Sequence, residues 1–198
     1  MKKEIAFFDF DGTITTKDTY LEFIKFSKGT LRFLTGFMLY SPLLVGYVLK
    51  LVPNQLMKEK VFRYYFKNTP LDRFQEWCDA FATQKVPALI RPKALEELKK
   101  LQQSGTTVVI VSASFGNWIQ KWASDNNFQL IATKPQVQNG RLTGAIDGKN
   151  CHGDEKVRRI RENYALQQYD TIYAYGDTSG DKPMLALATT AVYKPFRS

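Results

Sequence analysis

The chain has 198 residues, long enough for one or two domains with a substantial core, and its 44% hydrophobic and 24% charged residues exclude a disordered protein. Its 28 Lys and Arg residues exceed its 19 Asp and Glu residues. The net charge of +9 favours anionic partners, such as phosphorylated metabolites or an anionic lipid surface, or else serves only to solvate the surface. No run of basic residues interleaved with aromatics indicates a nucleic-acid groove, so we expect no nucleic-acid partner.

The cysteines and the first residues bear on the cellular compartment. Cys78 and Cys151 lie far apart and form neither a disulfide framework nor a zinc pattern, which favours a reducing cytoplasm. The apolar run after Glu4 is short and meets Asp9, unlike the apolar region of a secretory signal. We therefore expect a cytoplasmic protein.

The first predicted element is a strand at the start of Ile5–Thr16, which has the sequence IAFFDFDGTITT. A short apolar run of this kind is typical of a strand buried on both faces. Alternation along the strand would place Asp9 and Asp11 on one side and Phe10 on the other. Two carboxylates held this close suit a hard cation such as Mg²⁺, and Gly12 would let the backbone approach an anion. The alternative is a strand that ends in an ordinary Asp-Gly turn.

The next segment, residues 17–89, has almost no strand signal and predicts an inserted all-α unit of three to five helices. The first helix is expected to begin near Asp18 or Thr19 and to end at Gly29. Prolines separate two later helices, which we expect at residues 54–66 and 71–86.

Between the first and second of these helices lies an apolar stretch, residues 31–52. It carries no charge from Phe33 to Leu49, a length that borders on a membrane span. Ser41 and Pro42 interrupt it, which favours a helical hairpin broken at that point. Two interpretations stay open: peripheral contact of residues 31–52 with the inner face of the membrane, or packing within the helical unit or a dimer interface. The oligomeric state is left open.

Strands and helices alternate over the rest of the chain. Apolar runs predict strands at residues 106–111, 128–132, 171–175 and 190–193. Helical periodicity predicts helices at residues 92–103, 115–126, 154–165 and 182–188. Asn139 and Gly140 predict a hairpin turn within residues 136–145. The order of elements predicts an α/β fold with a three-layer, Rossmann-like core, a mainly parallel sheet and the all-α insertion.

Polar side chains follow three of the predicted strands, at the edge of an α/β sheet where ligands bind. A lysine lies near the start of the helix between the last two of these strands. These residues are Asp9, Asp11, Ser112, Asp177, Asp181 and Lys156. Attack by a carboxylate on phosphorus needs charge neutralised on both sides, which a metal ion and a lysine supply. The set therefore indicates a phosphate site.

The segments that carry these residues resemble, in order, the four motifs of the haloacid dehalogenase-like superfamily of aspartyl-phosphate phosphatases. DFDGT resembles the first motif, VIVSAS the second, Lys156 in GDEKVRRI the third and GDTSGDKPML the fourth. The sequence is similar to subfamily IB, the branch related to phosphoserine phosphatase, whose members carry a helical cap between the first two motifs. The resemblance implies a phosphoric monoester hydrolase with an α/β core formed by residues 1–16 and 90–198 and a cap formed by residues 17–89.

The resemblance also implies a role for each acidic residue. Asp9 is the nucleophile that forms the aspartyl-phosphate, and Asp11 protonates the leaving oxygen and then activates the hydrolytic water. Mg²⁺ is bound between Asp9, the main-chain carbonyl of Asp11 and Asp177. Asp181 is a further metal ligand or supports the others. From the residues alone, the plainer alternative for Asp181 is a helix cap.

Phosphate binding is implied for a second set of residues: Gly12, Ser112, Ala113 and Lys156. In the resemblance, the serine and the turn hold the phosphoryl oxygens, and Lys156 neutralises the nucleophile and the phosphate. The plainer alternatives are a strand terminator for Ser112 and a solvated helix face for Lys156. His152 beside Cys151 forms no complete metal-ligand set, so we expect both to be structural.

The substrate is left open between a small phosphorylated metabolite, phosphoserine and a lipid phosphate. Phosphoserine phosphatases have an acid nine residues after the nucleophile, and here Asp18 stands there, where it is equally a helix cap. They usually have Asn where this chain has Gly180, and we consider three arginines for a substrate carboxylate: Arg32, Arg63 and Arg73. Phosphatases of this branch that act on phosphatidylglycerol phosphate are similar in their apolar cap stretch. The intact acidic set argues against a non-catalytic phosphate-binding protein.

Overall fold

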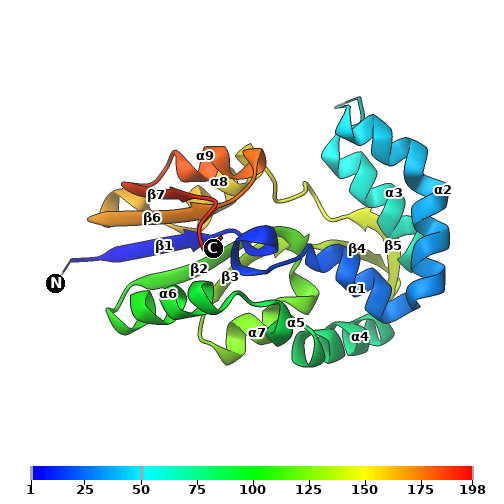
Figure 1. Ribbon diagram of the computed structural model, residues 1–198, viewed down its shortest axis with the longest axis horizontal. Coiled ribbons are helices and arrows are strands. Elements are labelled where there is room, and N and C mark those ends of the chain that lie inside the picture. The colour runs from blue at the N-terminus through cyan, green and yellow to red at the C-terminus, as the bar shows by residue number, and fades with distance from the viewer. Residues whose placement is uncertain (1, 50, 198) are drawn as a thin grey trace.

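The computed structural model describes residues 2–49 and 51–197. Its centre is a sheet of five parallel strands in the order β3-β2-β1-β6-β7 (Figure 1). The strands are β1 (Glu4–Phe8), β2 (Thr107–Phe115), β3 (Gln129–Thr133), β6 (Thr171–Gly176) and β7 (Thr190–Tyr193). Because all five are parallel, their carboxyl ends meet at one edge of the sheet.

Helices cover both faces of this sheet, in the three layers expected from the sequence. In Figure 1, α6 (Pro92–Gln103) and α7 (Gln120–Asp125) lie on one side, and α8 (Asp154–Asn163) and α9 (Lys182–Leu185) on the other. Alternate residues of β1 pack into the two layers: Phe7 joins the cluster that holds Ile160 of α8, whereas Phe8 joins the cluster that holds Leu98 of α6. The predicted α/β fold class is confirmed.

Some predicted boundaries were wrong. The second strand runs on to Phe115, so the helix expected from residue 115 is reduced to a 3₁₀ turn, Gly116–Trp118, and α7. The last helix ends at Leu185 instead of residue 188. Tertiary pairing decides these ends: β2 continues because it pairs with β3, through a register shift between Ser112 and Phe115.

The described part of residues 17–89 forms five helices, in agreement with the sequence. They are α1 (Thr19–Lys28), α2 (Thr30–Val48), α3 (Asn54–Phe66), α4 (Leu71–Gln84) and α5 (Val86–Leu89). The chain enters and leaves this unit at one point, where the Thr16 N–H donates to the Leu89 carbonyl at 2.8 Å. We propose that residues 17–89 are the cap and that residues 1–16 and 90–198 are the core domain.

A hairpin from the second half of the chain also contacts the cap. β4 (Pro135–Gln138) and β5 (Arg141–Ile146) are antiparallel and turn at Asn139 and Gly140, as predicted. The Asn68 N–H, just after α3, donates to the Leu142 carbonyl at 2.8 Å. The hairpin therefore lies beside α3 at the cap end of the molecule (Figure 1).

The hairpin predicted at Ser41-Pro42 was wrong, because α2 is one continuous helix with Pro42 inside it. A proline lacks the N–H that would bond the carbonyl four residues earlier, here that of Met38. The Ser41 hydroxyl donates to the Met38 carbonyl at 2.8 Å and satisfies it instead. A local side-chain bond thus lets the helix pass a residue that normally ends it.

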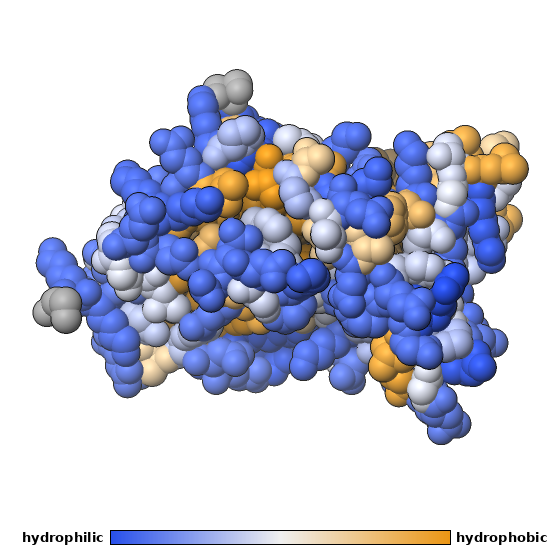
Figure 2. All heavy atoms as spheres, turned by 90° about the horizontal axis from the view of Figure 1, so that it is seen from below, coloured by the Kyte–Doolittle hydropathy of each residue, from blue (hydrophilic) through white to orange (hydrophobic). Residues whose placement is uncertain are grey.

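Most of the α2 surface is exposed, although its sequence is apolar. Only Gly36 is buried, where it lets Tyr65 of α3 approach closely enough for the phenol to donate to the Phe33 carbonyl at 2.9 Å. By length and composition α2 could cross a membrane, although core helices of soluble proteins and signal sequences pass the same test. Only 6% of its most apolar 18-residue window is buried. Apolar side chains accordingly reach the surface at the cap end in Figure 2.

Candidate active site

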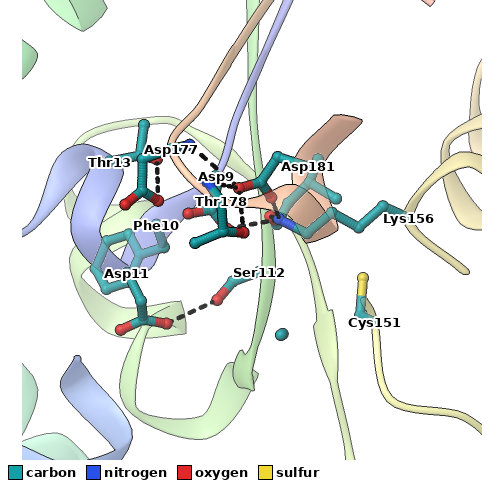
Figure 3. A network of polar contacts seen from close by, with 12 residues as sticks. Asp9, Phe10, Asp11, Thr13, Ser112, Cys151, Lys156, Asp177, Thr178 and Asp181 are labelled. Atoms are coloured by element: carbon teal, nitrogen blue, oxygen red, sulfur yellow. Dashed lines mark hydrogen bonds and ion pairs between the residues drawn. The ribbon is translucent and has the colours of Figure 1, made fainter. Parts of the chain in front are cut away.

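The site begins at the carboxyl end of β1, where Asp9 follows directly after the buried strand. The Asp9 N–H donates to the Tyr175 carbonyl of β6 at 2.9 Å, which continues the sheet ladder by one residue. The carboxylate points toward α8, and Lys156 Nζ donates to Asp9 Oδ1 at 2.5 Å (Figure 3). Both side chains are buried, so this ion pair lies out of water.

Lys156 binds three oxygen atoms at once. Besides Asp9, it donates to Asp181 Oδ1 at 2.7 Å and to the Val111 carbonyl of β2 at 2.8 Å. Burial disfavours the charge on Lys156, but Asp9 and Asp181 outweigh it and hold the lysine pKa above its usual range. Burial raises the pKa of Asp9 to about 7, and the Lys156 charge offsets only part of that effect. One ammonium thus faces two carboxylates, and the charges of Lys156, Asp9 and Asp181 do not sum to zero.

Asp177 and Asp181 follow β6 and form an acidic cluster with Asp9, in which carboxylate oxygens of all three lie within 4.8 Å of one another. Asp181 is already fully bonded: Oδ1 accepts from Lys156, and Oδ2 accepts from the N–H and hydroxyl of Thr178 at 2.9 and 2.8 Å. Burial opposes its charge, but Lys156 and these bonds outweigh burial and lower the pKa of Asp181. Asp181 therefore fits a supporting position better than a direct metal contact.

Asp177 is held from two sides. The Thr13 hydroxyl donates to Oδ1 at 3.1 Å, and Arg197 donates to Oδ2 at 2.5 Å. Asp9 and Asp177 present hard carboxylate oxygens close together, which is the donor chemistry that Mg²⁺ prefers. The excess of negative charge in the cluster gives a divalent cation a physical reason to bind, so these residues fit the metal that the sequence implied.

Gly12 lies against this cluster with φ +81°, and a Cβ there would stand 2.7 Å from Asp177 Oδ2. We expect Gly12→Ala to displace that carboxylate and to lower kcat about 10²-fold, at a cost of about 1–3 kcal/mol in the free energy of unfolding. Gly105→Ala is the matched control, because Gly105 has φ +84° and nothing within 4 Å of an added Cβ. Activity and urea unfolding of both variants separate strain from displacement. An equal loss of kcat in the two variants would contradict the prediction.

The alternation of the strand does not extend to Asp11, because Phe10–Ile14 form an irregular turn after β1 has ended. The Asp11 carboxylate turns to the amino end of α1, where the N–H and hydroxyl of Thr19 donate to Oδ1 at 2.6 and 2.5 Å. Trp118 Nε1 donates to the same hydroxyl at 3.1 Å and fixes it. The Ser112 hydroxyl donates to Asp11 Oδ2 at 3.3 Å (Figure 3). Asp11 thus connects the strand end to the first cap helix.

Ser112 and Ala113 lie where β2 passes the site. The register shift of β2 begins here, and such bulges often re-aim groups beside active sites. The Ser114 N–H donates to the Ser112 hydroxyl at 2.9 Å, and the Ala113 carbonyl accepts a hydrogen bond from Lys58 of α3. The cap therefore touches the core at the predicted phosphate-binding residues.

A cavity of about 420 Å³ lies between these residues and the cap. Asp9, Asp11 and Lys156 line it on the side of the sheet. Asp18 also lines it, while its carboxylate accepts the Leu21 N–H at 3.0 Å as the cap of α1, so both functions that the sequence left open for Asp18 are compatible. The cap side of the wall is mostly apolar and includes Ile24, Phe33, Phe37, Leu44, Met57 and Val61.

Sequence reasoning missed two charged residues at the site. Lys58 lines the cavity. It stands three residues before Val61 and four before Phe62, which places a lysine on the apolar face of α3. A charged residue at such a position is the sequence signal that could have identified it. Arg197 reaches Asp177 only through the fold, and no local pattern indicates it. The three arginines considered for a substrate carboxylate do not line the cavity: Arg32, Arg63 and Arg73.

The geometry suits attack on phosphorus. Asp9 is held by Lys156 with Oδ2 unbonded to any described residue, and Asp11 lines the same cavity, fixed by α1. A carboxylate nucleophile, a second carboxylate and a buried ammonium are the groups that a two-step phosphoryl transfer needs.

Comparison with known proteins gives a consistent result. The family model of haloacid dehalogenase-like hydrolases matches residues 6–186. Protein CicA of Caulobacter vibrioides is 36% identical over 192 residues, which cover 96% of this chain and 85% of CicA. A Bordetella pertussis protein of unknown function has a similar structure, with a TM-score of 0.85 at 20% identity over 98% of this chain and 90% of the other. A phosphoserine phosphatase solved as a phospho-aspartyl intermediate analogue gives a TM-score of 0.70 at 18% identity, over 98% and 87% of the two chains.

Proposed function

The chain belongs to the haloacid dehalogenase-like hydrolases, and from this premise we propose that it is a Mg²⁺-dependent phosphomonoesterase that acts through an aspartyl-phosphate on Asp9. The observation that carries the proposal is the buried Asp9–Lys156 pair at the end of β1, with Asp177 and Asp181 beside it. In that arrangement the Asp9 carboxylate is shielded from water, and it stays charged when a cation neutralises the excess negative charge of the acidic cluster.

The chemistry of each residue follows from its position. Oδ2 of Asp9 attacks phosphorus, and the bond from phosphorus to the ester oxygen breaks. The leaving oxygen takes a proton from the Asp11 carboxyl, which Thr19 and Ser112 hold in place. Asp11 then accepts a proton from the water that attacks the aspartyl-phosphate, which releases inorganic phosphate and restores Asp9.

The remaining residues stabilise charge. Lys156 neutralises Asp9 and one phosphoryl oxygen, and Ser112 with the N–H groups of the Gly12 turn and Ala113 accommodate the others. Asp9, Asp177 and the main-chain carbonyl of Asp11 would hold Mg²⁺, with Asp181 fixing Lys156 and the loop after β6. When bound, the metal supplies the positive charge that draws electrons from the phosphoryl group.

The test is phosphate release from a panel that contains phosphoserine, sugar phosphates, nucleotides and phosphatidylglycerol phosphate in micelles. We expect release that needs Mg²⁺ and stops when a chelator removes it. The wild-type protein with Mg²⁺ should act on at least one member. Release that is equally fast in excess chelator would contradict the metal dependence, and no release from any member would argue for a phosphate-binding protein.

Lys58 gives a pH dependence to substrate binding. Burial in the cavity lowers its pKa to about 8, although Asp11 and Asp18 oppose the shift. The ammonium loses its proton as the pH rises through that value, so we expect kcat/KM to fall above about pH 8, by roughly tenfold. Lys58→Met should lack this alkaline limb, whereas Lys60→Met, on the exposed face of α3, should keep it. Identical pH profiles for all three proteins would contradict the role of Lys58.

A second candidate, a lipid phosphate as substrate, is favoured by one further observation. The apolar wall of the cavity is built partly by α2, the same helix whose opposite side exposes apolar residues. An alcohol with an apolar chain could pass from a membrane surface along this helix to Asp9. We propose this as the narrower function, with the protein docked from the cytoplasm on the inner face of the membrane through residues 31–52.

Vesicle binding tests the docking. Leu31, Met38 and Val48 are 78, 74 and 75% exposed and lie outside the cavity. Their joint replacement by Gln should reduce binding to phosphatidylglycerol vesicles more than tenfold, because each buried side chain contributes about 1.5–3 kcal/mol. Val137→Gln on the hairpin is the control and should bind as the wild type does. Wild-type protein that fails to float with anionic vesicles would exclude the docking and leave soluble phosphomonoesters as substrates.

A further inference from the structure

His152 is a cavity residue that neither the fold nor the proposed chemistry uses. It lies between Cys151, which is buried, and the turn that begins α8, and its side chain reaches the catalytic cavity. Among the described residues, its ring takes part in no hydrogen bond or ion pair. The residue is exposed, so water satisfies its ring nitrogens when no ligand is bound. The ring is therefore available to a ligand in the cavity.

The chain makes room for this ring at Gly180. A Cβ on Gly180 would stand 2.2 Å from His152 Nε2 and 2.7 Å from Cδ2, and all three of its nearest atoms belong to the imidazole. Gly180 is not among the glycines with positive φ, so its backbone does not itself require glycine. The Gly153 N–H donates to the Gly180 carbonyl at 3.1 Å and locks the two loops together. The imidazole thus fills the space that a side chain at position 180 would take.

The neighbours of His152 define the chemistry that it faces. Lys156, Asp181 and Lys58 are close enough for their charges to act on the ring, and burial with the two lysines lowers the pKa of His152, which favours the neutral imidazole. Lys156 is committed to Asp9, Asp181 and Val111. Lys58 donates to the Ala113 carbonyl and to Asn150 Oδ1, which leaves one of its three N–H groups for the leaving group, beside His152. An ammonium and a neutral imidazole both suit an oxygen-bearing substituent, because the ring can donate to it or accept from it.

We propose that His152 determines specificity by hydrogen bonding a hydroxyl that the leaving alcohol carries close to the ester, on the Lys58 side of the cavity. The inference rests on the proposed phosphomonoesterase function and narrows its substrates to hydroxylated alkyl phosphates. The apolar wall beyond Lys58 would take the rest of the alcohol. Gly180 contributes to this specificity indirectly, because the absence of a side chain at position 180 leaves room for the His152 ring.

Two small esters test the assignment, 2-hydroxyethyl phosphate and propyl phosphate, which differ by a hydroxyl in place of a methyl group. Wild-type protein should favour the hydroxylated ester in kcat/KM by about tenfold, the value of one hydrogen bond to a partner that would otherwise stay unpaired. His152→Ala should bring this ratio close to one, and His152→Gln should restore part of it. The melting temperature of His152→Ala should stay close to that of the wild type, because the exposed ring forms no hydrogen bond or ion pair with the described residues.

Gly180→Ala supplies an independent arm. In the wild-type background it should displace the imidazole and lower the ratio as His152→Ala does. In the His152→Ala background it should change nothing further, because the three atoms nearest to the added methyl group all belong to the ring that has been removed. A loss from Gly180→Ala of the same size in both backgrounds would show that it acts on the neighbouring Asp181 instead, and would overturn the assignment.

A binding measurement separates this inference from the proposed function. Calorimetry on Asp9→Asn protein gives the Kd of each ester without turnover. Tighter binding of 2-hydroxyethyl phosphate that depends on His152 supports the subsite, even if no phosphate is released by wild-type protein, which would contradict the phosphatase. Equal Kd values for the two esters, or a preference that survives His152→Ala, would overturn the inference while leaving the phosphatase intact.

Discussion

Asp9→Asn should lower kcat by about 10⁴-fold or more while the protein stays folded. Removal of the nucleophile from a covalent mechanism leaves only binding and charge stabilisation, and losses of this size are the usual result. The amide keeps the shape of the carboxyl group and can still accept a hydrogen bond from Lys156. The lysine also keeps Asp181 and the Val111 carbonyl, so no buried charge is left without a partner.

The measurement is phosphate release at saturating Mg²⁺ on the best substrate of the panel. Asp170→Asn is the control, because Asp170 precedes β6, whereas the site follows the carboxyl end of that strand, and its carboxylate accepts the Lys3 N–H at 2.7 Å. It should retain wild-type kcat. An Asp9→Asn protein that keeps more than about a tenth of the activity would exclude Asp9 as the nucleophile.

Lys156→Met should cost both activity and stability. The methionine leaves Asp9 and Asp181 buried without the ammonium, and loss of one partner from a buried ion pair typically costs about 3–5 kcal/mol. The kcat should fall about 10²–10³-fold, because a donor to the charged phosphoryl group is also lost. Added Mg²⁺ should recover part of the stability, since it restores positive charge to the cluster.

The stability loss should depend on pH. Without the lysine, the buried carboxyls keep their protons to a higher pH than they do in the unfolded chain. A carboxyl whose folded pKa is raised favours the folded state at low pH, and this contribution is lost as the pH rises through the folded value. Urea unfolding should therefore show a smaller deficit at about pH 5 than at about pH 8. Lys182→Met, next in sequence to Asp181 but exposed, should match the wild type at both. A Lys156→Met protein as stable as that control at the higher pH would contradict the account.

The elements that carry the chemistry could be predicted because local sequence determines them. Apolar runs mark buried strands, and polar residues directly after those runs mark the carboxyl edge of the sheet, which is why the placement of Asp9 and Asp177 followed from the pattern. Ser112 was expected to follow its strand in the same way, but β2 runs three residues past it. The capping of α1 by Asp18 was predictable for the same reason, since the favoured residue types at that position are few.

What the sequence did not reveal depends on contacts between distant residues. Pro42 argued for a break in α2, and only the bond from Ser41 to the Met38 carbonyl explains why the helix continues. Asp11 turns away from strand alternation because Thr19 captures it. Arg197 meets Asp177 across 20 positions of the chain. Each outcome is set by one tertiary or side-chain contact that no periodicity encodes.

The same distinction applies to specificity. The part of the cavity wall next to Asp9 comes from strand ends, which the sequence pattern indicates. The cap side comes from α1, α2 and α3, and the sequence pattern does not indicate how these helices pack against one another. Lys58 and His152 line the same cavity although they lie 94 positions apart in the sequence. The reaction class was therefore easier to predict than the substrate.

The central claim is that a phosphoryl group passes through Asp9, and trapping that group is its most direct test. Wild-type protein and Asp11→Asn protein are mixed with 4-nitrophenyl phosphate and Mg²⁺, quenched in acid within a turnover and digested for mass spectrometry. The account predicts one added phosphoryl group on the peptide that contains Asp9, more of it in Asp11→Asn because the water is no longer activated, and none in Asp9→Asn. Phosphate release without any label on that peptide, or with label on another residue, would contradict it.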